Sequence, residues 1–158
     1  MTCATYCATI MANCTGANAQ YSTTDSCLGA CAAFTQGTLG ATGGNNLECR
    51  GYHANNAAGA GATTHCPHAG PAGDGVCGSN CESFCTVALA KCPAVFADGT
   101  ACTNACGAFA SNTAHFNSTV QSGNSFSCRE YHLSVAATGP TQATAHCGHI
   151  AAVSAPCQ

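Results

Sequence analysis

The apolar positions that recur at helical spacing in this chain are largely cysteines. Cys3, Cys7 and Cys14 are offset by 0, 4 and 11 positions, and such positions share one stripe of an α-helix. Cys27 and Cys31 are also four residues apart and predict a second short helix. The stretch TGANAQYSTTD between the two groups is typical of a turn. The pattern predicts two short helices joined by a loop.

Polar residues mark where the predicted helices begin. Asp25 or Ser26 could cap the second helix, because a short polar side chain can accept a hydrogen bond from the first free backbone N–H groups. A third helix is predicted from Asn45 to about Ala58, since Asn45 and Glu48 have the spacing of a capping box.

The third helix is also expected to carry chemistry. Cys49 and His53 lie one helical turn apart, so if Cys49 faces a disulfide core then His53 faces it too. The AGAGATT stretch that follows, residues 58–64, is predicted to be a loop. Because of its prolines and Gly70, the HCPHAGP stretch, residues 65–71, is predicted to be a turn rather than a long helix.

The whole pattern occurs twice, in residues 1–78 and again in residues 79–158. Every cysteine of the first half has a counterpart in the second, with shifts between 75 and 81 residues. The aligned pairs are Cys3/Cys81, Cys7/Cys85, Cys14/Cys92, Cys27/Cys102, Cys31/Cys106, Cys49/Cys128, Cys66/Cys147 and Cys77/Cys157. We expect two tandem domains, each folding as its own small module, with the boundary near Gly78 and Ser79.

The cysteine content indicates an oxidising compartment. The chain has 16 cysteines in 158 residues and no CxxC pair of the kind that metal-cluster proteins use. With no tryptophan and six phenylalanines, each half has little apolar core, so covalent staples are expected to stabilise it. We predict a small, mainly α-helical, disulfide-rich protein of two tandem helical-hairpin modules with long irregular loops, located outside the cell or on its surface.

Charge is scarce, and this narrows the choice of partners. Three basic residues against six acidic ones give a net charge of −3, which argues against nucleic acid or an anionic membrane as partner. A surface of small polar residues repels itself weakly, so we expect association with copies of the same chain. No stretch has the ~20 apolar residues of a transmembrane segment. Because the pattern starts at Cys3, we expect a mature chain whose export signal has been removed.

Six of the seven histidines occupy matched positions in the two halves. A Cys-Arg-x-Tyr-His block and a His-Cys-x-His block are retained in both, while neighbouring residues differ. The histidines are His53, His65 and His68, matched by His132, His146 and His149; the accompanying residues are Arg50 and Tyr52, matched by Arg129 and Tyr131. His115 has no counterpart and is expected at the surface.

Two interpretations of these blocks stay open. Three imidazoles can hold one Cu²⁺ or Zn²⁺ ion with a coordination position left free, and a haem held by His53 and His68 is the less favoured variant. Alternatively, the imidazoles hydrogen-bond loop carbonyls inside a small core, Arg50 does the same, and Tyr52 is packing.

Catalysis is not expected. The chain has no GxSxG, HExxH, P-loop or GxGxxG motif, its acidic residues are not duplicated, and every cysteine has a role in the framework.

Two resemblances follow from the motifs. The CxxxC…CxxxC helix pairs resemble an α-hairpinin, and this resemblance implies the bonds Cys3–Cys31 and Cys7–Cys27. For the remaining cysteines we expect Cys14–Cys49 and Cys66–Cys77. The phrases YCATIMANCTGANAQY, CRGYHANNAAG and HCPHAGPAGDGVCG are similar to a family of cysteine-rich exported proteins of myxobacterial type. That resemblance implies export and a bacterial source but no reaction.

The sequence thus favours a non-catalytic extracellular structural protein, a subunit of a self-assembling filament, coat or surface structure. A His-based metal- or haem-binding protein for sequestration or electron transfer is the alternative. A secreted binding module or inhibitor is a third possibility.

Overall fold

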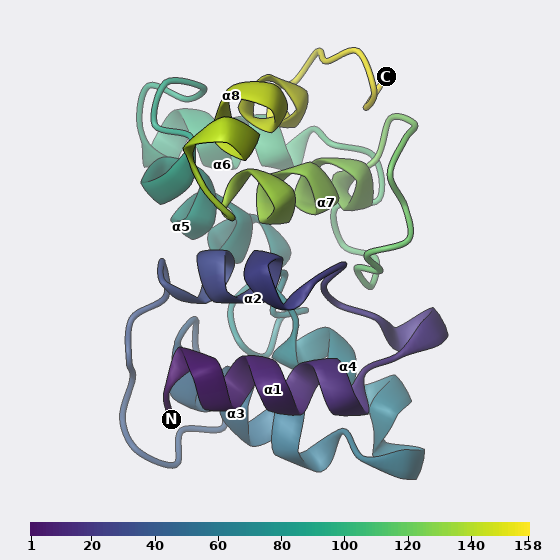
Figure 1. Ribbon diagram of the computed structural model, residues 1–158. Helices are drawn as coiled ribbons and strands as arrows, with labels where there is room; N and C mark the ends of the chain where they lie inside the picture. The colour runs from purple at the N-terminus through teal and green to yellow at the C-terminus, as the bar shows by residue number, and fades with distance from the viewer.

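A computed structural model describes residues 1–158, and the molecule is helical with no β-strand (Figure 1). This confirms the predicted small, disulfide-rich, mainly α-helical fold. The first half contains α1 (Cys3–Asn13), α2 (Thr24–Cys31), α3 (Leu47–Asn56) and α4 (Ala62–Ala69). The second contains α5 (Asn80–Lys91), α6 (Gly99–Gly107), α7 (Phe126–Ala136) and α8 (Pro140–His146). Short 3₁₀ helices lie at Gly16–Asn18, Gly59–Gly61 and Cys147–Ile150. No helix has the length and apolar character needed to cross a bilayer.

The helix starts differ slightly from the expected ones. The cap of α2 is Thr23, whose side chain accepts from the backbone N–H of Ser26. The Ser26 hydroxyl in turn accepts from the backbone N–H of Thr23. The cap of α3 is Asn46 and not Asn45, because the Asn46 side chain accepts from the N–H of Cys49. Asn45 instead donates to Thr86 in the second half.

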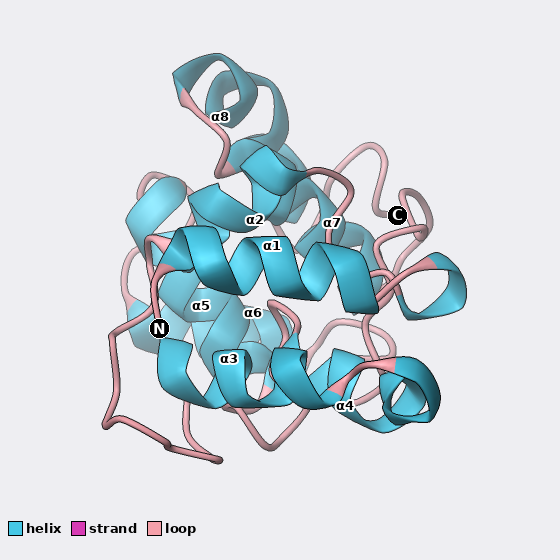
Figure 2. Ribbon diagram, turned by 60° about the horizontal axis from the view of Figure 1, so that its bottom comes forward, coloured by secondary structure: helices cyan, strands magenta, loops and turns pink.

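The prediction for residues 58–71 was wrong over much of its length. Residues 62–69 form the helix α4 and include Pro67, although Pro67 cannot donate to the carbonyl of the preceding turn. Only that one hydrogen bond is lost in so short a helix. The packing of α4 on α1 and α3, and the disulfide at Cys66, hold it in place (Figure 2).

The disulfides confirm one half of the predicted pairing and correct the other. The helix pairs are clipped by Cys3–Cys31 and Cys7–Cys27, and equally by Cys81–Cys106 and Cys85–Cys102. The expected Cys14–Cys49 and Cys66–Cys77 bonds are wrong. The remaining bonds are Cys14–Cys66 and Cys49–Cys77, with Cys92–Cys147 and Cys128–Cys157 in the second half.

Tertiary structure explains the corrected pairing. The C-terminal end of α1 lies against α4, which places Cys14 beside Cys66. A backbone hydrogen bond from Gly44 to Val76 brings the following residue, Cys77, to the start of α3 and so to Cys49. No cysteine is free, and every disulfide lies within one half.

The two halves share one hydrophobic core. It is a cluster of 30 buried residues drawn from both halves, rich in cysteine, alanine and phenylalanine. α2 lies between α1 and the second half, where it packs on α7 (Figure 1). The approach is close because Gly29 of α2 has no side chain. A Cβ atom there would collide with the carbonyl oxygen of Ala137.

Candidate metal centres

Each half brings its three matched histidines together. In the first half His53 projects from α3, and His65 and His68 lie three residues apart on α4, so they share a helix face. In the second half His132 lies on α7, His146 ends α8 and His149 lies in the following 3₁₀ helix. We call these groups centre 1 (His53, His65, His68) and centre 2 (His132, His146, His149). In each centre, one nitrogen from every ring lies within 4.8 Å of the others.

The nitrogens that face one another are Nδ1 atoms. The Nδ1–Nδ1 distance is 2.9 Å between His53 and His65, and 2.9 Å between His132 and His146. In centre 2 the Nδ1 atom of His149 also lies 3.2 Å from that of His132. The same geometry therefore arises twice, although the second centre is built on a broken helix.

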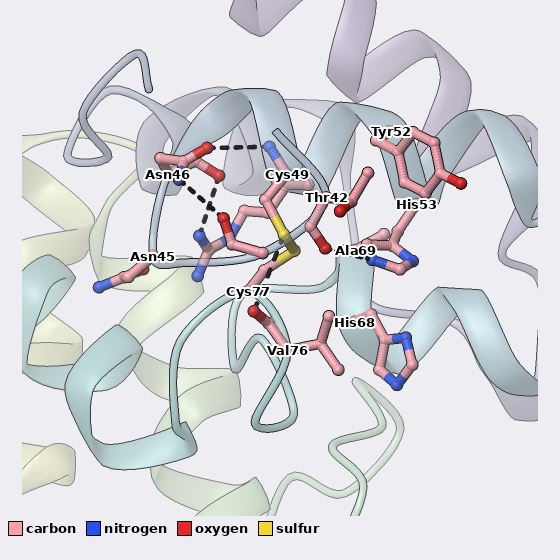
Figure 3. The surroundings of a disulfide bond; sticks show 12 residues. Thr42, Asn45, Asn46, Cys49, Tyr52, His53, His68, Ala69, Val76 and Cys77 are labelled. Atoms are coloured by element: carbon pink, nitrogen blue, oxygen red, sulfur yellow. Dashed lines mark hydrogen bonds between the residues drawn. A yellow bond between two sulfur atoms is a disulfide. The ribbon is translucent and has the colours of Figure 1, made fainter. Parts of the chain in front are cut away.

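A backbone carbonyl fixes the orientation of the central ring in each centre. His53 Nε2 lies 3.2 Å from the carbonyl oxygen of Thr42, and His132 Nε2 lies 3.2 Å from that of Gln121 (Figure 3). A carbonyl only accepts hydrogen bonds, so Nε2 carries the proton and Nδ1 keeps its lone pair. Metal-binding histidines are commonly held in this way by a partner at the other ring nitrogen.

The distances suit a shared ion. Two nitrogens bound to one ion at about 2.0–2.1 Å lie about 2.9 Å apart at a right angle and about 3.4 Å apart at the tetrahedral angle. The observed separations of 2.9 and 3.2 Å fall within this range. The remaining nitrogen pairs of each centre lie within 4.8 Å, so binding an ion requires the rings to turn toward it.

The environment keeps the central imidazoles neutral. Burial lowers the pKa of His53 and of His132, and the neighbouring imidazoles of each centre lower it further. Burial also lowers the pKa of His68 and His146. A histidine must be neutral to bind a metal, so this environment favours the ligating form.

Disulfides hold the elements that carry the histidines. Cys49–Cys77 ties down α3 one turn before His53, and its sulfur atoms lie within 4.8 Å of a ring nitrogen of His53 (Figure 3). Cys128–Cys157 has the same relation to His132. These sulfurs are bonded to each other, so the imidazoles are the ligands available.

The matched arginines support the loops around the centres. Arg50 is fully buried, donates to the carbonyls of Asn46 and Pro71, and covers the ring of Phe34 at 3.6 Å. Arg129 donates to three carbonyls of the C-terminal loop, those of Ala151, Ala152 and Cys157. Both arginines act on backbone, as the packing interpretation expected for Arg50.

The matched tyrosines pack beside the central rings. Tyr52 meets His53 edge to face with 5.1 Å between ring centroids, and Tyr131 meets His132 likewise at 5.2 Å. Tyr52 is partly exposed.

One residue near centre 1 was missed by sequence reasoning. Asp74 lies 3.8 Å from His68 Nε2 and accepts a 2.8 Å hydrogen bond at Oδ1 from His115 Nδ1. The comparison of the halves could not find it, because the second half has no acidic residue at that place. His115 is 73% exposed, as expected for a surface residue, and its contact with Asp74 was not foreseen. A surface pocket of about 300 Å³ shares Asp74 with this region but none of the six histidines.

The comparisons with known proteins concern mainly the first half. Residues 1–80 match the family model described as the BfoA family C-terminal domain. No curated protein and no solved structure matches the chain. The match covers just over half of the 158 residues and contains all of centre 1, and the chain therefore belongs to the BfoA family.

Proposed function

We propose that this chain is an exported metal-binding protein that holds one Cu²⁺ or Zn²⁺ ion in each half through three imidazole Nδ1 atoms. The observation that carries the proposal is the duplicated geometry. In both halves the central histidine donates to a carbonyl eleven residues earlier and points its Nδ1 at another Nδ1, 2.9 Å away.

The packing interpretation accounts for part of this arrangement. It explains the bonds of His53 and His132 to loop carbonyls. It also explains the close Nδ1 pairs, since one imidazole can donate a hydrogen bond to the other, but it leaves the third ring of centre 1 without a partner. The Nδ1 atom of His68 is buried and has no hydrogen-bond partner. A cation at the centre would satisfy all three Nδ1 atoms together.

The ligand set narrows the choice of ion. Imidazole suits Zn²⁺ and Cu²⁺, and three neutral ligands leave a coordination position for a further ligand. Haem fits less well. Two axial histidines must lie on opposite faces of the macrocycle. The rings of His53 and His68 are nearly perpendicular with their centroids 4.8 Å apart, and those of His132 and His149 with theirs 4.6 Å apart, which leaves no room for a macrocycle between them.

The setting suits sequestration or transfer of the metal outside the cytoplasm. Eight disulfides require an oxidising compartment, and the ligands contain no thiol that oxidation could remove. The expected extracellular or cell-surface location is part of this proposal.

The test is metal titration of the full oxidised chain. We expect two ions of Cu²⁺ or Zn²⁺ per chain by elemental analysis after gel filtration, and none for the double variant His53→Ala with His132→Ala. Asn104→Ala, at an exposed residue of α6 outside both centres, is the control and should keep two ions. An unaltered stoichiometry in the double variant, or no bound metal in the parent chain, rules the proposal out.

The expectation of a self-assembling structural subunit stays a prediction. It rests on the sparse charge and on the heavy cross-linking. Electron microscopy of concentrated protein would show whether filaments or sheets form, with and without bound metal.

A further inference from the structure

The two centres differ in one chemical feature, a carboxylate that lies beside centre 1 only. Asp74 stands three residues before Cys77, and the residue three before Cys157 is Ser154. Ser154 uses its hydroxyl to donate to the carbonyl of His149. No acidic group forms an ion pair with any histidine of centre 2, since the ion pairs of the chain involve only Glu48 and Asp74.

The backbone holds Asp74 in an unfavourable conformation. Its φ is 52°, and it lies between Gly73 and Gly75, which also have positive φ. Only one other non-glycine residue of the chain, Ser111, has positive φ. A side chain in this region costs about 1 kcal/mol, which a third glycine would avoid. The carboxylate is 9% exposed, so it is not merely a solubilising group.

The contacts of His68 give this carboxylate a role. The Nε2 atom of His68 faces Asp74 at 3.8 Å, which leaves the buried and unpartnered Nδ1 for the centre. His149 directs the same nitrogen to centre 2. A carboxylate that accepts from the far nitrogen of a metal-binding histidine fixes the tautomer and makes the near nitrogen a stronger ligand, and Asp74 at 3.8 Å is placed to form that bond when the ring turns toward an ion. The nearby negative charge also attracts the cation.

The second half completes this arrangement. His115 reaches Asp74 from the 112–125 loop and holds Oδ1, so that Oδ2 is the oxygen turned toward His68. Centre 1 is thus assembled from both halves, whereas centre 2 uses residues of the second half alone.

We infer that the two centres are unequal, with Asp74 acting as a positioning residue that makes centre 1 the tighter site and the first to fill. This inference rests on the proposed function. In the sequence of loading, metal enters centre 1 at low supply and centre 2 only when supply rises.

The test measures each centre alone in the full chain. His146→Ala leaves centre 1 and His65→Ala leaves centre 2, and Zn²⁺ is titrated against a competing chelator. Centre 1 should bind Zn²⁺ about 10- to 100-fold more tightly, the usual effect of such an outer carboxylate. Adding Asp74→Asn should remove this advantage in the His146→Ala chain and leave the affinity of the His65→Ala chain unchanged.

A second substitution separates loss of the carboxylate from a change in the backbone of the loop. Asp74→Gly removes the carboxylate at a backbone conformation that glycine adopts freely, and it should weaken centre 1 as Asp74→Asn does. Equal affinities in the two single-centre chains overturn the inference and leave the proposed function intact. The same holds if Asp74→Gly keeps the tight site, or if Asp74→Asn weakens both centres alike. Failure of both chains to bind Zn²⁺ overturns the inference and the proposed function together.

Discussion

The third helix of the first half and its counterpart in the second differ at the residue before the shared tyrosine. The first half has Gly51, where the side chain of Met1 lies so close that a Cβ atom would collide with it. The second half has Glu130, which is fully buried with both carboxylate oxygens unpaired. The cysteine, arginine and histidine around this position are the same in both.

Each half must meet two requirements, which are to bring its histidines together and to fit against the other half. The residues that build a centre are retained, and the position between them has been free to adapt to its surroundings. Glu130 lies in the electrostatic field of Arg50 from the other half, and Arg50 donates to Ser83 across the same boundary. The three histidines of each centre come from one half, whereas docking uses unlike residues from the two.

The largest expected effect comes from a disulfide. Replacing Cys14 and Cys66 by serine frees α4, so it should abolish metal binding at centre 1 and leave centre 2 intact. The loss of the bond should also lower the free energy of unfolding by about 2–5 kcal/mol. Cys3→Ser with Cys31→Ser is the control: it should lower stability, measured by denaturant unfolding, while both centres keep their metal.

Arg50→Met should lower the free energy of unfolding slightly less than loss of the disulfide does. It removes donors to Asn46, Pro71 and Ser83 and leaves Glu130 without a nearby cation, so we expect a loss of about 2–4 kcal/mol. Arg129→Met tests the matched position, whose hydrogen bonds all stay within the second half, to the C-terminal loop and to the start of α7. Only Arg50 bonds across the boundary between the halves. Chemical unfolding should therefore show two transitions for Arg50→Met, because the halves unfold separately, and one for Arg129→Met.

Gly29→Ala probes the docking surface without changing charge. The added methyl group collides with the carbonyl of Ala137, and such overpacking should cost about 1–3 kcal/mol in thermal unfolding. Asn104 is the aligned residue of the second half and is exposed. Asn104→Ala should therefore change stability by less than about 0.5 kcal/mol.

The smallest expected change is in the free energy of unfolding per pH unit. Burial raises the pKa of Glu130 to about 8, while Arg50 opposes the shift. The folded state thus holds a proton that the unfolded chain releases near its ordinary value of 4.5, so this group destabilises the fold progressively as pH rises from 4.5 to 8. Relative to the parent chain, the free energy of unfolding of Glu130→Gln should therefore rise by up to about 1.4 kcal/mol per pH unit in that window. Parallel urea titrations of the metal-free chains at pH 6 and 8 measure the gain, and a constant difference contradicts it.

Much of the fold was predictable because the chain carries its own comparison. Two copies of the CxxxC pairs and of the histidine blocks identified the helix pairs and the six histidines that the structure brings together in threes. Where prediction was wrong, the deciding contact was tertiary. Asn45 would cap as well as Asn46, but its side chain is turned to the second half, where it donates to Thr86 and accepts from Ser83. Pro67 disfavours a helix, but packing on α1 and α3 stabilises one. Asp74 had no repeat partner to reveal it.

The order of the disulfides along the chain has a consequence for biogenesis. Cys14–Cys66 and Cys49–Cys77 interleave, so neither bond joins the cysteine nearest in sequence, and the short ring Cys66–Cys77 competes with both. Closing a short ring costs less chain entropy, so the non-native ring is favoured before the helices pack. Correct oxidation thus requires α1, α3 and α4 to assemble first, or a thiol catalyst that reopens early bonds. Where the helices do not pack first, reaching the native pairing depends on thiol–disulfide exchange that reopens the Cys66–Cys77 ring.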